Sequence, residues 1–346
     1  MLYATTRSNS YVETAYRAAH LNRCSDGGLF VPFRLPQVEP AQIKAMKDRS
    51  FGQNIADILN MFFGCELTGW DVDFAIGRSP VRFTTIPHKV LIAEIWHCRE
   101  NRFAYVVDSL SKLICGKDLV DVPTNWVCIA VRIAAIFASY GQLLASGQIE
   151  CHIPLDIAVA TGDFAGPMAA WYARKMGLPL GNIICGCNAN GTVWDLLHRG
   201  EMSTGALRTV TNTPEADIVL PENLERFIEV NLGKDAVHTY LDKCRTGQVY
   251  TVSEQAVEQL RMAMFASVIS NSRVSSIIHS VYRTNGYVFS PYAALAYGSL
   301  LDFRAKTGES RPAMLLSEKS PLCDCDLVAA SMNVAVDEVM KMVSLG

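Results

Sequence analysis

The chain has 346 residues, of which 50% are hydrophobic and 19% are charged, and 31 basic residues against 34 acidic ones give a net charge of −3. A chain of this length buries enough apolar surface to fold without disulfides or a structural metal. The composition excludes intrinsic disorder, and the lack of a concentrated basic cluster argues against nucleic acid as a partner. Length alone favours one large domain or two ordinary ones.

The 11 cysteines are odd in number and are spread from Cys24 to Cys325. The first residues show no signal-peptide pattern, so we expect reduced, mostly buried thiols in a cytoplasmic protein. Two Cys-x-Cys pairs, Cys185/Cys187 and Cys323/Cys325, could each offer two thiolates to a soft metal if their segments are extended. Structural zinc sites usually space such cysteines more widely, so we expect buried thiols and no metal site.

The first part of the chain, residues 1–65, is predicted to be a helical extension that packs on the core, followed by a single α/β domain over residues 66–346. Within the extension, Asp26-Gly27-Gly28 predicts a turn before a short apolar run. Helical patterns cover residues 41–48 and 54–63.

Residues 126–145 form an apolar stretch that is about long enough to span a bilayer. Arg132 lies near its middle, and an unpaired arginine at that depth costs a few kcal/mol or more in lipid. The stretch therefore predicts a buried helix of a soluble protein, and we expect no membrane contact.

Residues 155–160 predict a buried strand, which runs through a turn at 161–166 into a helix at 167–176 and then a strand at 182–187. This order is typical of a parallel sheet with helices on both faces, so the predicted fold class is α/β. Two more strands are predicted at 90–96 and 313–316. The other helical patterns lie at 106–114, 193–198, 223–230, 236–243, 253–270, 293–306 and 326–343.

The turn at residues 161–166 is the most informative local feature. Backbone N–H groups at a glycine turn and a helix N-terminus favour an anion, typically a phosphate. However, Asp163 places a negative charge where a phosphate would lie, and Ala165 stands where a second glycine would allow closer approach. An ordinary loop in which Asp163 caps the helix explains the same residues, so both interpretations stay open.

A dense polar cluster at residues 97–102 follows a predicted strand. Cys98 beside two arginines could have a lowered pKa, although a solvated loop explains the same residues. Elsewhere the sequence shows no His-x-x-x-His and no Ser/His/Asp signature, so it does not support a hydrolase or a metalloenzyme.

Several segments, taken in order, resemble threonine synthase, a family of fold-type-II pyridoxal phosphate (PLP) enzymes. They are residues 3–7 with 26–32, 158–166 with 177–179, 187–193, 213–218 with 223–227, and 286–287 with 290–294. The resemblance covers roughly residues 1–110 and 125–325. It implies a tryptophan synthase β-like fold, a cytoplasmic location and lyase chemistry in amino-acid biosynthesis.

The departures from this family matter as much as the matches. The family's lysine forms the Schiff base with PLP, and the counterpart segment at residues 97–105 places Ala104 at that position. An alanine cannot form an imine. The family's second βαβ region has no counterpart between residues 116 and 126, so we expect the smaller domain to be largely deleted.

Other changes fall on the remaining cofactor contacts that the resemblance implies. Asn188 matches the family's Asn-rich loop, and Glu318 is the nearest match to the hydroxyl that meets the pyridine nitrogen; a glutamate could pair with a protonated ring nitrogen. Tyr292 replaces the histidine of a Pro-His motif. The remnant phosphate loop consists of Thr161, Gly162, Asp163, Phe164 and Ala165.

These changes predict a threonine synthase-like protein that has no catalytic residue and no cofactor and acts as a binding or regulatory subunit. The alternative is a still-active PLP-dependent lyase or threonine synthase-type enzyme that uses Lys89 or Lys112 as an unusual imine donor. A third possibility is a sensor of a small anion or amino acid. The chain could form a homo- or hetero-oligomer.

Two specific expectations follow for the site. We expect no formation of threonine from O-phosphohomoserine. We also expect the carboxylate of Asp163 to turn into the loop, where it would accept hydrogen bonds from the backbone N–H groups of Gly162, Phe164 and Ala165 and exclude a phosphate by charge repulsion.

Overall fold

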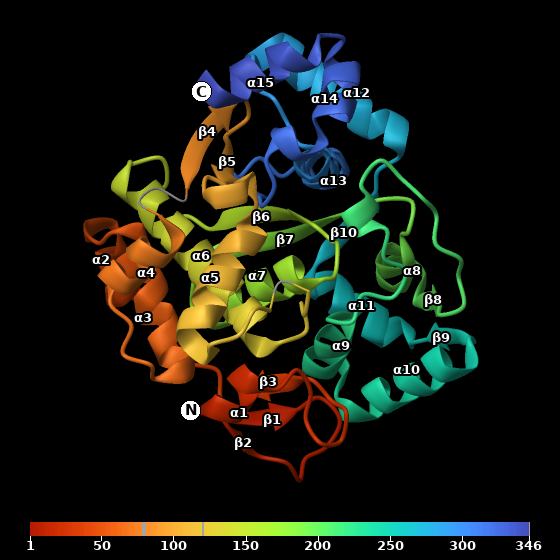
Figure 1. The fold of residues 1–346 in the computed structure, drawn as a ribbon. Helices are drawn as coiled ribbons and strands as arrows, with labels where there is room; N and C mark the ends of the chain where they lie inside the picture. The colour runs from red at the N-terminus through yellow and green to blue at the C-terminus, as the bar shows by residue number, and fades with distance from the viewer. Residues whose placement is uncertain (78–80, 120, 346) are drawn as a thin grey trace.

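Six strands form the central sheet of the computed structural model, which describes residues 1–77, 81–119 and 121–345 (Figure 1). Their order is β10-β7-β6-β11-β5-β4; the first five are parallel and β4 is antiparallel to β5. The predicted α/β fold with a parallel sheet is confirmed. The strands are β4 (Arg82–Ile86), β5 (Val90–Glu94), β6 (Leu155–Ala160), β7 (Leu180–Cys187), β10 (Phe265–Val268) and β11 (Ala313–Ser317).

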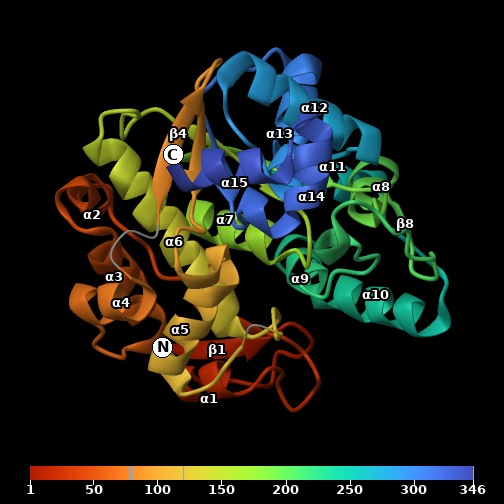
Figure 2. The ribbon, with the colours of Figure 1, turned by 45° about the horizontal axis from the view of Figure 1, so that its top comes forward.

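Helices cover both faces of this sheet, as predicted (Figure 2). Successive side chains of a strand point to opposite faces, so Ile157 and Val159 belong to one apolar core and Ala158 belongs to the other. The first core includes α5 (Phe103–Cys115), α6 (Trp126–Ala145) and α7 (Ala165–Lys175). The second core includes α12 (Asn271–Asn285), α13 (Pro291–Thr307), α14 (Cys325–Met332) and α15 (Val336–Leu345).

The long apolar helix α6 is a core helix of a soluble fold. It is the one helix in the described part of the chain that is long and apolar enough to cross a membrane, and 83% of its most apolar window is buried inside the protein. It packs against α3 (Phe51–Phe63), α5 and α7. The hydrophobic composition of this helix therefore reflects burial between other helices.

One glycine permits the close packing of α13 on the sheet. A Cβ atom at Gly186 of β7 would lie 2.4 Å from the carbonyl oxygen of Leu295 in α13, far inside van der Waals contact. Any side chain at this position would push the helix away from the strand. The fit of α13 over the middle of the sheet thus depends on this residue type.

The amino-terminal region contains three strands where the sequence predicted mainly helix. β1 (Leu2–Thr5) pairs with β2 (Glu13–Thr14) and with β3 (Phe30–Pro32), and both pairs are antiparallel. The turn at Gly27 brings β3 back to β1, a long-range pairing that local patterns do not reveal. The helices of this region are α1 (Ala15–His20), α2 (Pro40–Ala45), α3 and α4 (Gly69–Ile76).

Tyr3 makes buried contacts both within this region and with the rest of the chain. The Tyr3 hydroxyl donates to the Phe62 carbonyl at 3.0 Å, and its ring lies 5.8 Å from that of Trp126. Whether the chain divides into domains at residue 65 remains a prediction.

Two predicted helices were wrong in extent. Residues 253–270 form α11 (Glu254–Ala263) and then β10, which adds to the sheet edge beside β7. The alanines and methionines there suit a helix, but pairing with a neighbouring strand overrides that local preference. Residues 326–343 are split into α14 and α15 because Asn333 adopts a left-handed conformation with φ of 59° that ends the first helix.

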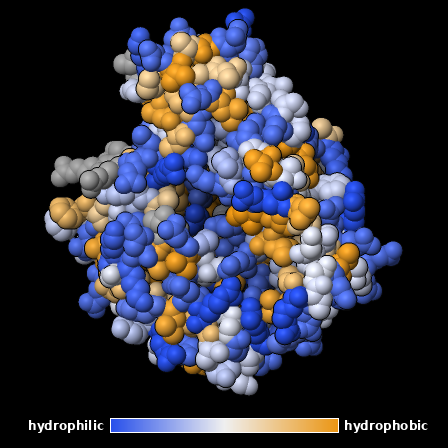
Figure 3. Space-filling model, turned by 45° about the vertical axis from the view of Figure 1, so that its right-hand side comes forward, coloured by the Kyte–Doolittle hydropathy of each residue, from blue (hydrophilic) through white to orange (hydrophobic). Residues whose placement is uncertain are grey.

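The elements not yet named follow β7 in the sequence, apart from the short 3-10 helices, which are spread along the chain. They are α8 (Thr192–Arg199), β8 (Glu201–Ser203), α9 (Leu224–Leu232), α10 (Lys234–Thr246) and β9 (Val249–Thr251), with short 3-10 helices at η1 (Met46–Asp48), η2 (Arg99–Asn101), η3 (Pro214–Ala216) and η4 (Pro321–Asp324). β8 and β9 form a small antiparallel pair. The face drawn in Figure 3 mixes hydrophilic and hydrophobic residues and is hollowed near its centre.

No second parallel sheet is present in the described residues. α5 ends at Cys115 and α6 begins at Trp126, so the connection is far shorter than the roughly 30 residues that a βαβ unit needs. Val120, within this connection, lies outside the described residues. The expected deletion of the smaller domain is therefore confirmed for the part of the connection that the structure describes.

The topology also predicts where a ligand would bind. β6 and β11 are neighbours, but the chain leaves β6 toward α7 on one face and leaves β11 toward α14 on the other. A crevice forms outside the carboxyl ends of two parallel strands whose connections part in this way. The residues that follow Ala160 and Ser317 are placed at this crevice.

Candidate functional site

A cavity of about 570 Å³ lies at the carboxyl ends of β6 and β11. Its walls combine apolar side chains with seven charged ones, three positive and four negative. The charged residues are Arg102, Arg132, Lys319, Asp121, Asp163, Glu215 and Glu318. Convergence of polar groups in an otherwise apolar hollow at a topological switch point marks this cavity as the candidate binding site.

The loop between β6 and α7 forms one wall. Phe164 adopts a left-handed conformation with φ of 68°, and its N–H donates to the Thr161 carbonyl at 2.7 Å. The carboxylate of Asp163 turns inward, and its Oδ1 accepts from the N–H of Ala165 at 2.8 Å. The predicted inward carboxylate is thus present. Of the three N–H groups that it was expected to bind, it accepts from that of Ala165. The N–H of Phe164 donates instead to the Thr161 carbonyl.

Of the predicted loop residues, Thr161, Gly162 and Asp163 line the cavity, whereas Phe164 and Ala165 are buried behind it. The Thr161 hydroxyl donates to the Gly186 carbonyl at 3.1 Å and so points back to the sheet. The role of these residues in binding a cofactor remains a prediction.

An ion pair between Arg132 and Glu318 crosses the cavity. Nε of Arg132 lies 3.3 Å from Oε1 of Glu318, and its terminal nitrogen lies 3.1 Å from Oε2, which is a two-point contact. Burial works to lower the pKa of Arg132, but the carboxylates of Glu318 and Asp163 outweigh this effect and raise it. Arg132 is therefore permanently charged, and Glu318 is engaged by its own chain.

Ala104 lies in the first turn of α5 and lines the cavity. At the position where the resemblance implies a lysine, the wall thus presents a methyl group. The two lysines that the sequence offered as alternatives lie elsewhere. Lys112 pairs with Asp108 at 2.6 Å on the exposed side of α5, and Lys89 lies in the turn between β4 and β5, beside a separate hollow.

Lys319 is the lysine that does line the cavity, and sequence analysis did not single it out. Only 9% of its side chain is exposed, and its Nζ lies 2.9 Å from Oε1 of Glu215 and 3.2 Å from Oδ1 of Asp324. The ammonium also lies 4.6 Å from the centre of the Tyr292 ring. Burial works to lower the pKa of Lys319, but the bond to Glu215 and the nearby Asp324 raise it on balance.

Asn188 does not line this cavity. Its side-chain amide donates to Thr211, Thr213 and Asp217 at distances between 2.8 and 3.1 Å, in a buried network between β7 and the segment before η3. This network shapes the segment that carries Glu215. In its observed contacts, Asn188 therefore stabilises the fold and does not face the cavity.

Burial makes the thiols of Cys98 and Cys187 less acidic than usual. Burial raises the pKa of Cys98 to about 11 and that of Cys187 to about 12, so the suggestion of a lowered pKa at Cys98 was wrong. Burial is the largest cause, because removal from water disfavours the thiolate. Among the described residues no group of three or more His, Cys, Asp or Glu side chains could hold a metal ion.

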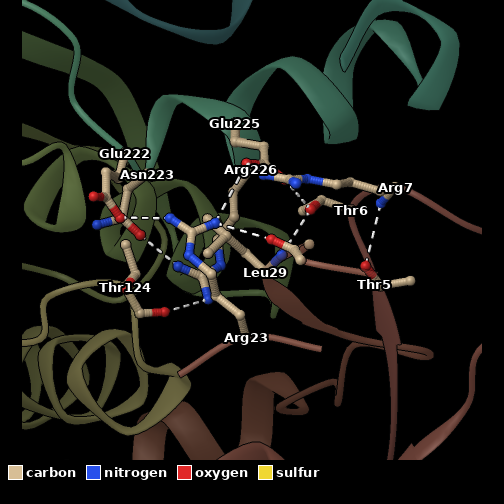
Figure 4. Close-up of polar contacts among 12 residues, drawn as sticks. Thr5, Thr6, Arg7, Arg23, Leu29, Thr124, Glu222, Asn223, Glu225 and Arg226 are labelled. Atoms are coloured by element: carbon tan, nitrogen blue, oxygen red, sulfur yellow. Dashed lines mark hydrogen bonds and ion pairs between the residues drawn. The ribbon is translucent and has the colours of Figure 1, made fainter. Parts of the chain in front are cut away.

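A second polar cluster, which we call the clamp, joins the amino-terminal region to the start of α9 (Figure 4). It consists of Thr5, Thr6, Arg7, Arg23, Leu29, Thr124, Glu222, Asn223, Glu225 and Arg226. Arg226 is fully buried and donates to the carbonyls of Phe30 (3.0 and 3.1 Å) and Thr124 (2.8 Å). Burial lowers the pKa of Arg226 to about 10.

The clamp ties three distant segments together at the start of α9. Asn223 donates to the carbonyls of Pro123 and Asp163, each at 3.2 Å, and both of these residues line the cavity. Glu225 accepts from Arg7 at 2.9 Å through both of its oxygens. The amino-terminal sheet therefore supports the loops that shape the cavity.

Comparisons with solved structures define the class of this fold. PLP-bound threonine synthase from Brucella melitensis superimposes with a TM-score of 0.83 at 19% identity, over 96% of this chain and 92% of that one. Threonine synthase from yeast gives a TM-score of 0.82 at 16% identity, over 99% of this chain and 94% of that one. The chain thus has the fold of the fold-type-II PLP enzymes.

Sequence comparisons find similarity to threonine synthases and threonine synthase-like proteins over part of the chain. Residues 2–79 match the family described as "Threonine synthase N terminus". Human "Threonine synthase-like 1" is 27% identical over 175 residues, 50% of this chain and 24% of that protein. "Threonine synthase" of Pseudomonas aeruginosa is 29% identical over 186 residues, 52% of this chain and 38% of that enzyme. The amino-terminal part of the chain thus matches a threonine synthase family model, and the segments that match these relatives span between about a quarter and two fifths of their length.

Proposed function

We propose that this chain is a non-catalytic, cytoplasmic member of the threonine synthase family that binds a small molecule in the cavity at β6 and β11 and acts as a binding or regulatory subunit. The observation that carries this proposal is the position of Ala104. Its methyl group forms part of the cavity wall where the family resemblance calls for the lysine that anchors PLP.

The other residues of the cavity do not fit a covalently held PLP. The N–H of Ala165 at the start of α7 is already bound by Asp163, whose charge opposes a phosphate at the same place. Glu318, the candidate partner of a pyridine nitrogen, is paired with Arg132. We therefore derive no chemical step through PLP.

Lys319 provides the strongest case for the rival function, an active PLP enzyme with a displaced lysine. An amine must lose its proton before it attacks an aldehyde. Two carboxylates, Glu215 and Asp324, hold this ammonium and keep its pKa raised, which favours the unreactive form. This balance supports a binding role for Lys319 over a catalytic one.

The test is a direct assay of the family's reaction. Purified protein is incubated with PLP and O-phosphohomoserine, and threonine is measured by mass spectrometry. We expect no threonine above the level of a heat-inactivated control. Turnover that is lost in Lys319→Ala, Lys89→Ala or Lys112→Ala would show that the protein is an enzyme and would identify its lysine.

A further inference from the structure

The environment of Lys319 is asymmetric in a way that points to a ligand. Of the two carboxylates on its ammonium, Asp324 is enclosed, with 14% of its side chain exposed, whereas 54% of the Glu215 side chain is exposed. A buried ammonium needs an anionic partner and hydrogen-bond acceptors, because burial of an unpaired charge is costly. Asp324 supplies the inner partner and Glu215 the outer one.

A second cation converges on the same carboxylate. The guanidinium of Arg102 lies 3.3 Å from Oε1 of Glu215, the oxygen that Lys319 also binds at 2.9 Å. An ammonium and a guanidinium that meet at one point form a strong site for a carboxylate, through charge-assisted hydrogen bonds. Both side chains also line the cavity, so the site opens into it.

The carboxylate of Glu215 is held only weakly between Lys319 and Arg102. It belongs to the three-residue helix η3, is largely exposed, and forms ion pairs of a kind that contribute little when one partner is solvated. A ligand carboxylate that replaced it would gain the same two contacts and would keep the charge of Lys319 compensated.

The rest of the cavity limits the ligand to one negative charge. At the β6 end, Asp163 and Glu318 face a single cation, Arg132, so a second anionic group would be repelled there. Between the two ends the wall is apolar and includes Ala104, Val159, Ile218 and Leu316. A single carboxylate on a short apolar body matches this lining, whereas a phosphate dianion would add a charge that the exchange with Glu215 does not balance.

We propose that Lys319 and Arg102 form a carboxylate-binding site, that Glu215 occupies this site as an internal substitute, and that a small monocarboxylate displaces Glu215. This inference rests on the proposed function in one respect only, that the cavity serves binding.

The test compares binding of sodium butyrate, at constant ionic strength, to the wild type and to Glu215→Gln by calorimetric titration. Removing the internal competitor should make butyrate bind about fivefold more tightly. Glu258→Gln, the same charge change on the exposed side of α11, serves as the control and should leave affinity unchanged. Lys319→Met should abolish binding, and Arg102→Gln, at a side chain that is 46% exposed, should weaken it about fivefold.

Two results would overturn the inference. One is unchanged or weaker butyrate binding in Glu215→Gln, which would show that Glu215 does not compete for the site. The other is tighter binding of inorganic phosphate than of butyrate by the wild type, which would assign the site to phosphate. Threonine formation would refute the non-catalytic proposal without altering either binding result, so the two failures are distinguishable.

Discussion

The clamp and the cavity each contain a largely buried arginine, and the two arginines have different kinds of hydrogen-bond partner. Arg226 in the clamp binds neutral carbonyl oxygens of Phe30 and Thr124, which are fixed by the backbone. Arg132 in the cavity binds the side chain of Glu318, which is 31% exposed. The clamp is therefore a rigid structural joint, whereas the cavity is held by ion pairs that side-chain motion can rearrange.

The two regions also differ in how closely their residues follow the threonine synthase pattern. The segments that build the clamp, residues 3–7, 26–32 and 223–227, are those that stay close to the threonine synthase pattern. The residues that depart from this pattern, Ala104, Asp163 and Glu318, all line the cavity. The loss of catalysis that we propose would explain this division, because a scaffold that must fold cannot lose its buried polar contacts without a stability cost.

The largest effect is expected in the clamp. Arg226→Met leaves the carbonyls of Phe30 and Thr124 without a donor, so we expect the free energy of unfolding to fall by about 4 kcal/mol in urea denaturation. Arg245→Met, at a side chain that is 77% exposed, is the matched control and should cost about 0.5 kcal/mol or less. Equal losses in both variants would show that the clamp is not a structural joint.

A smaller loss is expected in the cavity. Arg132→Met leaves the charge of Glu318 unpaired and should lower the free energy of unfolding by about 2–3 kcal/mol. Glu318→Leu in the same chain should restore part of this loss, because it removes the stranded charge. Additive losses in the double variant would contradict the pairing.

The loop at Asp163 tests the ligand preference of the cavity. Asp163→Asn removes the negative charge while keeping an oxygen for the N–H of Ala165, so inorganic phosphate should bind about fivefold more tightly in a calorimetric titration. Asp242→Asn on the exposed surface of α10 is the control. If Asp163→Asn binds phosphate no better than the wild type, the carboxylate is not what opposes an anion there.

The smallest effect concerns a charge outside both regions, at the start of β6. Burial raises the pKa of Asp156, although hydrogen bonds from Asn182 oppose the shift. The folded state then holds a proton that the unfolded state has lost, so stability falls as pH rises from the ordinary carboxyl pKa through the raised one. Asp156→Asn should flatten this decline in urea denaturation curves recorded at a series of pH values above the ordinary carboxyl pKa. Parallel stability curves for the two proteins would refute the assignment.

The sequence predicted β5, β6, β7 and β11 of the central sheet because these strands are mostly buried and are therefore almost continuously apolar. It missed β4, whose residues are mostly only partly buried. It failed at β10 and at the amino-terminal strands, where the pairing partner is distant in the sequence. The family resemblance placed Ala104, Asp163 and Glu318 at one site. It did not predict that Lys319, Arg102 and Glu215 lie together. These residues follow β11, follow η2 and belong to η3, and only the folded chain brings these segments into contact.

The most direct test of the central claim, that this protein has no lysine for PLP, is chemical trapping. The protein is mixed with one equivalent of PLP, reduced with sodium borohydride and examined by intact mass and peptide mapping, since reduction makes any imine permanent. We predict no visible absorbance band and no labelled peptide above a denatured control. Stoichiometric labelling of Lys319, with an absorbance band before reduction, would contradict the account and identify an active PLP enzyme.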